Sequence, residues 1–184
     1  ARHGHLYANG VPFDVKGINW FGSEGRTGPP SGLNHHPLGW YLDFLARHRF
    51  NAIRLLFNHE SMLKDEVIES TEVLRAPGLT GVTYVRMFQL VAEAAQSRGI
   101  LVMLACHRIH PTAWPGHGLW YDPNGPITEE LVLTAWDTVA EGFCDLWNVF
   151  AVDLQNEPHA ASWGFGRNTD WDRAASRIGS HVLS

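Results

Sequence analysis

The sequence predicts an α/β fold, the N-terminal half (strands 1–4) of a (β/α)8 TIM-type barrel preceded by a β-hairpin. Four short apolar runs alternate with four segments whose apolar residues recur at helical spacing, which implies a parallel sheet with right-handed crossovers. Long loops follow the apolar runs and short turns follow the helical segments, as in such barrels. An open doubly wound sheet also fits this alternation, but Gly164-Phe165-Gly166 lacks the third glycine of a dinucleotide fingerprint.

The N-terminal elements follow from turn and periodicity signals. Asn9-Gly10 is a strong signal for a two-residue hairpin turn, because both residue types tolerate positive φ, so residues 6–13 form a small hairpin. Apolar patterning then predicts a strand over 13–20, a helix over 38–48 and a second strand over 50–57. Residues 58–80 form a long connection.

The remaining elements repeat the same alternation. Gly99 ends a helix over 84–98, and Thr128 caps a helix that runs to about residue 147. Strands are predicted over 100–105 and 149–155, and a last helix begins near Asp170. Each strand is followed by a loop that carries polar or aromatic side chains.

Composition excludes several classes of partner. A formal net charge of −5 without a basic run argues against nucleic acid and anionic membrane surfaces. The apolar runs are shorter than the ~18–20 residues that a membrane span needs. We expect no metal or other cofactor, because neither a carboxylate nor a cysteine completes a ligand spacing with His107, His110 and His159.

The ends of the four predicted strands carry the residues with chemistry. They are Trp20, Arg54, His107, and Asn156 with Glu157. The carboxyl ends of barrel strands converge on one mouth, which is where such folds bind ligands. Pro158 ends strand pairing and leaves Glu157 at the lip, where we expect it to be half-buried and therefore a proton donor. Guanidinium, imidazole, amide and carboxylate groups beside aromatic rings suit a polyol such as a sugar.

These motifs together resemble the family 5 glycoside hydrolases, most closely the bacterial-type endo-β-1,4-glucanases. The resemblance is carried by Gly17-Ile18-Asn19-Trp20-Phe21-Gly22, Asn51-Ala52-Ile53-Arg54-Leu55, His107-Arg108 and Leu154-Gln155-Asn156-Glu157-Pro158-His159. It implies retaining hydrolysis of a β-1,4-glucan through a covalent intermediate, which needs two carboxylates about 5–5.5 Å apart. The Asn-Glu-Pro motif is short and recurs across related barrel families, and it is its combination with the other three strand ends, in the right order, that makes the resemblance specific.

The resemblance also implies a role for each site residue. Glu157 is the general acid/base, Asn156 binds the 2-hydroxyl at the cleavage point, and His107 binds substrate hydroxyls. Arg54 orients the nucleophile, and Trp20 and Trp120 line sugar subsites.

Two departures from the family pattern shape our expectations. An aspartate usually stands two residues before the strand-three histidine, where this sequence has Ala105. The family's nucleophile lies on the seventh strand, so we expect residues 1–184 to be a partial catalytic barrel, inactive alone, that self-associates or pairs with a C-terminal half. The resemblance implies secretion, although these residues include no signal peptide.

Two other readings stay open. The first is a non-catalytic carbohydrate-binding half-barrel that uses Trp20, Trp120, His107 and Asn156. The second is an open-sheet nucleotide enzyme, which the missing glycine fingerprint disfavours. The choice among cellulose, mannan, xylan, a short glucoside and a glycolipid depends on loops that these motifs do not define.

Overall fold

Four parallel strands form the central sheet of the computed structural model, which describes residues 5–69, 71–113 and 116–184. The strands lie in chain order β3-β4-β5-β6. Their bounds are Gly17–Trp20 (β3), Ala52–Asn58 (β4), Leu101–Arg108 (β5) and Val149–Asp153 (β6). Each strand is followed along the chain by one long helix, so the predicted α/β alternation is confirmed.

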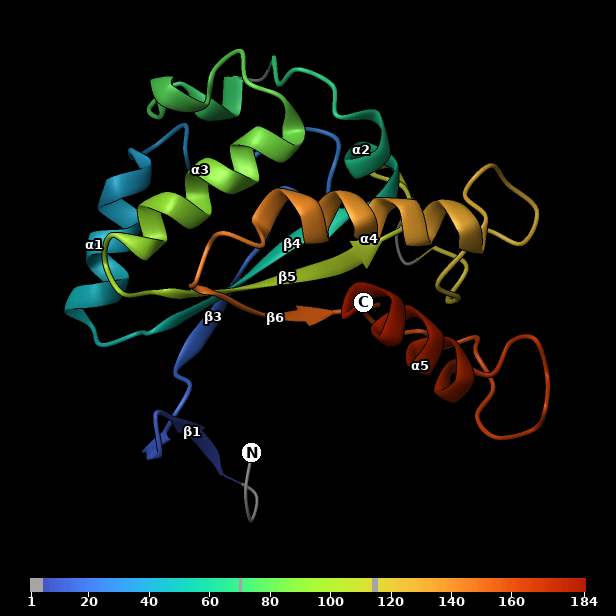
Figure 1. Cartoon of the computed structure of the whole chain (residues 1–184). Coiled ribbons are helices and arrows are strands. Elements are labelled where there is room, and N and C mark those ends of the chain that lie inside the picture. Colours follow the sequence, from blue (N-terminus) through green and yellow to red (C-terminus); the bar gives the residue numbers. More distant parts are fainter. Residues whose placement is uncertain (1–4, 70, 114–115) are drawn as a thin grey trace.

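Long helices follow the strands of the sheet, and all but the last of them cover one face of it (Figure 1). They are α1 (Leu38–Arg47), α3 (Tyr84–Gln96), α4 (Glu129–Phe143) and α5 (Trp171–Val182). Figure 1 shows α1, α3 and α4 stacked over the strands, with α5 beyond the end of β6. Side chains alternate between the two faces of each strand, so Ile53 and Leu55 point to the helices and are fully buried. Arg54, which lies between them, points to the opposite face.

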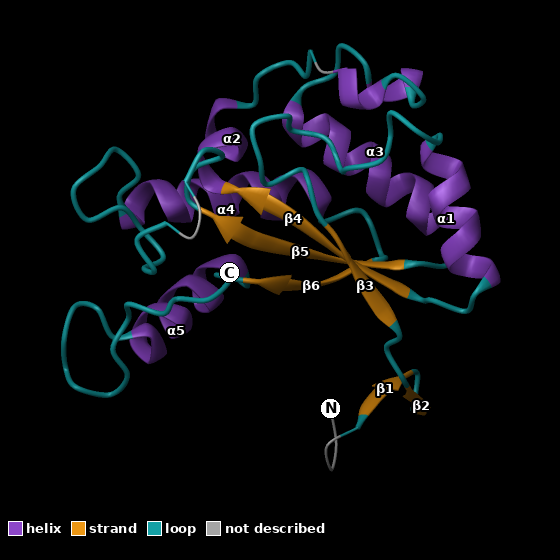
Figure 2. Cartoon of the chain, turned by 180° about the vertical axis from the view of Figure 1, so that it is seen from behind, coloured by secondary structure: helices purple, strands orange, loops and turns teal. Residues whose placement is uncertain are grey.

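A separate two-stranded hairpin precedes the sheet, as predicted. β1 (Leu6–Ala8) pairs antiparallel with β2 (Val11–Phe13). Asn9 and Gly10 have φ values of +52° and +83°, the left-handed conformation that a two-residue hairpin turn requires. Figure 2 shows the hairpin at the foot of β3, away from the helices and from the carboxyl ends of the strands.

The predicted connection over 58–80 contains regular structure that the sequence patterning missed. Helix α2 (His59–Lys64) begins directly after β4, and two 3₁₀ turns follow at Thr71–Val73 and Pro77–Leu79. Asn58 caps α2, because its side-chain oxygen accepts a hydrogen bond from Ser61 N at 2.8 Å. Across the described ranges, no helix is both long and apolar enough to cross a bilayer.

Candidate active site

Arg54 is the hub of a polar network on the open face of the sheet. Its Nε and Nη2 donate to Asp153 Oδ2 at 3.0 and 2.5 Å, so β4 is tied to β6 across β5. Its Nη1 donates to Asn19 Oδ1, and its Nη2 also donates to Asn156 Oδ1, both at 3.1 Å. The cation that the sequence places inside an apolar run is therefore compensated by a carboxylate and two amides.

Glu157 lies at the lip of the sheet in a strained conformation. Its φ is +46°, a left-handed value that costs a residue with a Cβ of the order of 1 kcal/mol or more and is concentrated at functional sites. The turn is held from both sides, because Asn156 N donates to Cys106 O at 2.8 Å and His159 N donates to Glu157 O at 2.7 Å. Sequence reasoning expected a half-buried carboxyl, but Glu157 is exposed, since no described segment covers it.

His107 lies beside Glu157 and Asn156. The three residues line one depression, with Gly118 and Leu119 of the following loop on its other wall. Burial lowers the pKa of His107, and the cations Arg54 and Arg108 lower it further, whereas the carboxylates Glu24 and Glu157 act in the opposite sense. The imidazole is therefore neutral at pH 7 and is able to donate one hydrogen bond and accept another.

The depression itself is small. Its volume is about 20 Å³, which is room for about one water molecule rather than for a glucose ring. These residues therefore form one wall of a sugar-sized cleft, and they do not enclose one.

Trp20 does not lie at this wall, contrary to the sequence prediction. It is the register partner of Leu55, so its side chain points to the helix side of the sheet, opposite Arg54. Its ring is 6% exposed and packs 5.3 Å from the ring of Tyr41, and its Nε1 donates to Ser31 O at 2.9 Å. Strand alternation explains the error, because Asn19, one residue earlier, is the one whose side chain points to the open face of the sheet, where it contacts Arg54.

Trp120 is also a core residue rather than a surface for stacking a sugar. It is fully buried against Tyr121 and Trp171, with ring centroids 5.3 and 5.5 Å away. Its Nε1 donates to Glu129 Oε2 at 2.9 Å, which satisfies its only polar atom. An indole with no exposed surface has no face to offer a ligand, so this prediction is wrong for the described conformation.

Asp153 and Asn19 are site residues that sequence reasoning missed. Asp153 follows four apolar residues of β6, just as Arg54 lies within an apolar run of β4. A charge in such a run needs a partner, and the rule that singled out Arg54 applies equally to Asp153. Asn19 had a weaker signal, because it was identified only as part of the Gly17–Gly22 motif.

A second polar cluster fastens the loop after β5. His110 contacts Glu60 through Nδ1 at 2.6 Å and Asp122 through Nε2 at 3.1 Å, and His117 contacts Asp122 at 3.3 Å. The cluster joins α2 to the loop that forms one wall of the Glu157 depression. Within the described ranges, no group of three or more His, Cys, Asp or Glu side chains is arranged to hold a metal ion.

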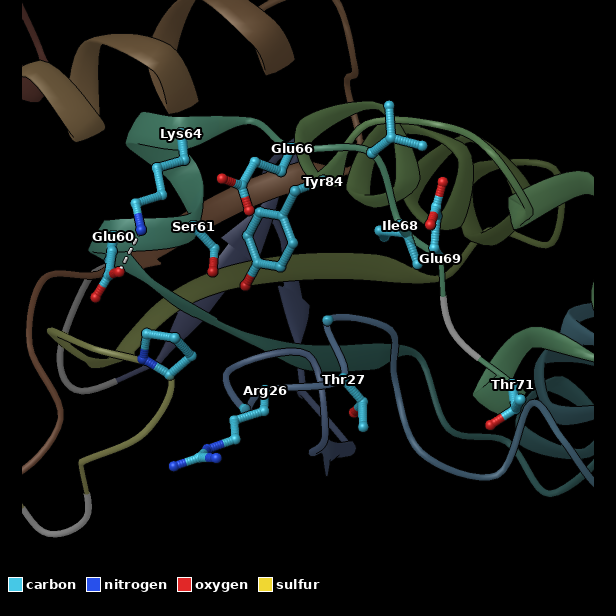
Figure 3. A pocket seen from close by; sticks show the side chains of 14 residues that line it. Arg26, Thr27, Glu60, Ser61, Lys64, Glu66, Ile68, Glu69, Thr71 and Tyr84 are labelled. Atoms are coloured by element: carbon cyan, nitrogen blue, oxygen red, sulfur yellow. Dashed lines mark hydrogen bonds and ion pairs between the residues drawn. The ribbon is translucent and has the colours of Figure 1, made fainter.

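A larger cavity, of about 530 Å³, is lined by residues of α2 and of the loops on either side of it in the chain. Figure 3 shows Arg26, Lys64 and Glu66 around it, with Lys64 bound to Glu60 by an ion pair of 2.6 Å. Its lining does not include His107, Asn156 or Glu157. It is therefore distinct from the candidate active site.

Known proteins with similar sequences are cellulases. Residues 6–184 match the family Cellulase (glycosyl hydrolase family 5). An endoglucanase of Paenibacillus polymyxa is 33% identical over 91% of this chain and 42% of the relative. The major extracellular endoglucanase of Xanthomonas campestris pv. campestris is 32% identical over 96% of this chain and 36% of the relative.

Solved structures agree with the sequence matches. The catalytic domain of the Xanthomonas enzyme superposes with a TM-score of 0.87 at 30% identity, over 97% of this chain and 51% of that one. A cellotetraose complex of an endocellulase from Pyrococcus horikoshii gives 0.85 at 33% identity, over 94% of this chain and 48% of that one. The chain thus spans about half the length of these structures, and it belongs to glycoside hydrolase family 5, the cellulase family.

Proposed function

We propose that this chain supplies the acid/base half of a retaining β-1,4-glucanase site. Glu157 protonates the oxygen of the leaving sugar, and then acts as a base that activates water against the glycosyl-enzyme intermediate. Asn156 and His107 bind hydroxyls of the sugar at the cleavage point, and Arg54 orients the neighbouring groups. The second carboxylate, the nucleophile, is contributed by barrel strands beyond the four described here.

One observation supports this proposal above the others. Asn156 and Glu157 follow β6, His107 lies near the end of the neighbouring strand β5, and all three line a single depression on the open face of the sheet. The amide is oriented by Arg54, and the carboxyl is held in a left-handed turn. Strained, over-determined geometry of this kind is typical of catalytic groups.

The small volume of the depression favours a shared cleft. A glucose ring needs a second wall, which the remaining half of a barrel would supply. We therefore propose that the open face and the two sheet edges, β3 and β6, pair with a C-terminal half-barrel or, in its absence, with another copy of the chain. We also propose that the protein is secreted, as the name of the Xanthomonas relative says of that enzyme.

A non-catalytic carbohydrate-binding half-barrel remains the second candidate, favoured by the exposed position of Glu157 and by the small depression. It no longer has Trp20 and Trp120 as stacking surfaces, so Asn156 and His107 would have to carry the binding.

Hydrolysis of an aryl β-cellobioside distinguishes the two candidates. The chain is assayed alone and mixed with the C-terminal half of the Paenibacillus polymyxa relative. Turnover in the mixture that is lost in Glu157→Ala and kept in Glu130→Ala supports the glucanase. Glu130 is an exposed residue in the first turn of α4, and so serves as the control. Binding of cellotetraose without turnover in the mixture supports the carbohydrate-binding module instead.

A further inference from the structure

We propose that Asp153 is a positioning residue, which locks Arg54 so that Arg54 holds the Asn156 amide with its NH₂ group toward the sugar. The inference rests on the proposed function and assigns a task to a carboxylate that none of the motifs includes. It also accounts for the absence of the strand-three aspartate at Ala105.

The contacts show how Asp153 restrains the side chain of Arg54. Two nitrogens of Arg54, Nε and Nη2, donate to the same oxygen of Asp153, which restrains the guanidinium in its plane. The two side chains are 22% and 31% exposed, so water screens the pair only partly. In this orientation Nη2 also reaches Asn156 Oδ1.

The Asn156 amide is thereby oriented. Its Oδ1 accepts from the arginine, so its Nδ2 carries the two hydrogens that point away from Arg54. A sugar hydroxyl that meets Asn156 is then bound as an acceptor. If Arg54 were free to change rotamer, the amide could turn over, and the site would offer an oxygen where the ligand needs a donor.

Ala105 makes the long reach of Arg54 feasible. Adjacent strands lie about 4.8 Å apart, so β4 and β6 are separated by roughly 10 Å with β5 between them. Arg54 is the register partner of Met103 on β5, and Ala105, two residues further on, is the partner of Asp153 on β6, so the arginine crosses β5 between Met103 and Ala105. An aspartate at position 105 would lie one strand nearer to Arg54. We infer that Asp153 supplies the carboxylate that the family pattern places there.

Moving the carboxylate tests this inference. Asp153→Asn keeps the shape of the side chain and removes its charge. Adding Ala105→Asp to this variant returns a carboxylate, now one strand closer to Arg54. Adding Ala105→Asn instead gives the uncharged control for that double variant. Asp43→Asn is the matched control, because Asp43 pairs with Arg98 at 2.6 Å far from the site. The readouts are the Nε–Hε NMR resonance of Arg54, assigned with Arg54→Lys, and the Kd for cellotetraose in the mixture with the C-terminal half of the Paenibacillus polymyxa relative.

We expect Asp153→Asn to broaden the Arg54 resonance and weaken cellotetraose binding about tenfold. Adding Ala105→Asp to Asp153→Asn should restore both the resonance and the Kd, whereas adding Ala105→Asn should leave both as they are in Asp153→Asn. The single variant Asp43→Asn should behave as wild type. An unchanged Arg54 resonance and Kd in Asp153→Asn overturn the proposal, as does equal recovery with Ala105→Asn. If wild type mixed with the C-terminal half does not bind cellotetraose, the proposed function fails, and the Arg54 resonance still decides whether Asp153 restrains the arginine.

Discussion

Trp120 and Glu129 form a hydrogen bond of 2.9 Å that joins the loop after β5 to the first turn of α4. The same carboxylate accepts from Arg177 of α5, at 2.8 Å from Nη2 to Oε1. One side chain thus links a loop and two helices behind the candidate site. Glu129 also lies at a helix N-terminus, where the macrodipole favours a negative charge.

Removing this link should destabilise the fold. Glu129→Ala leaves the buried indole N–H of Trp120 without its acceptor, which costs about 1–3 kcal/mol. The exposed neighbour Glu130 serves as the control, and Glu130→Ala should change the free energy of unfolding by less than about 0.5 kcal/mol. Urea unfolding of both variants measures the difference, and equal stabilities would contradict the assigned role of Glu129.

His59 should make stability depend on pH. It is fully buried between Phe57 and Trp136, and neither ring nitrogen has a hydrogen-bond partner among the described residues. Burial lowers the pKa of His59 from 6.5 to about 3. Between these values the unfolded chain binds a proton that the folded chain does not, so stability is complete above pH 6.5 and falls as the pH drops, by up to about 1.4 kcal/mol per pH unit.

The variant His59→Leu isolates this contribution. Carboxylates such as Glu60 and Asp122, whose pKa values are lowered, also lose stability in acid, but they do so in both proteins. The difference in free energy of unfolding between wild type and His59→Leu should therefore change between pH 7 and pH 4.5 by roughly 2–3 kcal/mol in favour of the variant. Parallel curves would show that His59 is accessible to protons in the native state.

Gly118 should matter for the wall of the site as well as for its own turn. A Cβ added there would meet His159 Nε2 at 2.5 Å, and its φ is +69°. Gly164 has a similar φ of +73° with nothing within 4 Å, so it reports the backbone strain alone. Both Gly→Ala variants should lose about 1 kcal/mol of stability, and only Gly118→Ala should also weaken cellotetraose binding. Equal affinities would place the Gly118–His159 contact outside the binding wall.

The uncovered surface beside β3 should drive association of the isolated chain. Trp40 and Phe44 of α1 are 45% and 42% exposed, and with Trp20 they line an apolar cavity of about 440 Å³. Phe44→Glu should shift a dimer or larger species toward monomer in sedimentation. Leu183→Glu, at an 88% exposed position outside this cavity, should not. A wild-type chain that sediments as a cooperatively unfolding monomer would contradict the proposed pairing.

Much of the fold was predictable because local signals agreed with the tertiary structure. The Asn9-Gly10 turn and the Thr128 cap act within a few residues, and Thr128 Oγ1 accepts from Leu131 N as expected. Helix α2 was missed because its six residues are too few to show a period. Its cap, Asn58, also lies inside the apolar end of β4, where it reads as part of the strand.

The site was predictable where the position of a side chain follows from the end of its own strand. It was not predictable where the position depends on contacts with residues distant in the sequence. His107, Asn156 and Glu157 lie at the strand ends that the patterning identified. Trp20 and Trp120 were misplaced because tryptophan suits a cleft and a core equally well. For Trp20 the core position follows from the face of β3 on which it lies, and for Trp120 it follows from the hydrogen bond to Glu129. The Arg54–Asp153 pair joins residues 99 positions apart, which no local pattern reveals.

The most direct test of the account is azide rescue of Glu157→Ala in the mixture with the C-terminal half of the Paenibacillus polymyxa relative. A dinitrophenyl β-cellobioside forms the glycosyl-enzyme without acid assistance, so the variant should stall before hydrolysis, and azide should release β-cellobiosyl azide at a restored rate. Asp172→Ala, an exchange of a carboxylate at the start of α5, should behave as wild type. Turnover by Glu157→Ala equal to that of Asp172→Ala, with no azide product, would contradict the assignment of Glu157 as the acid/base.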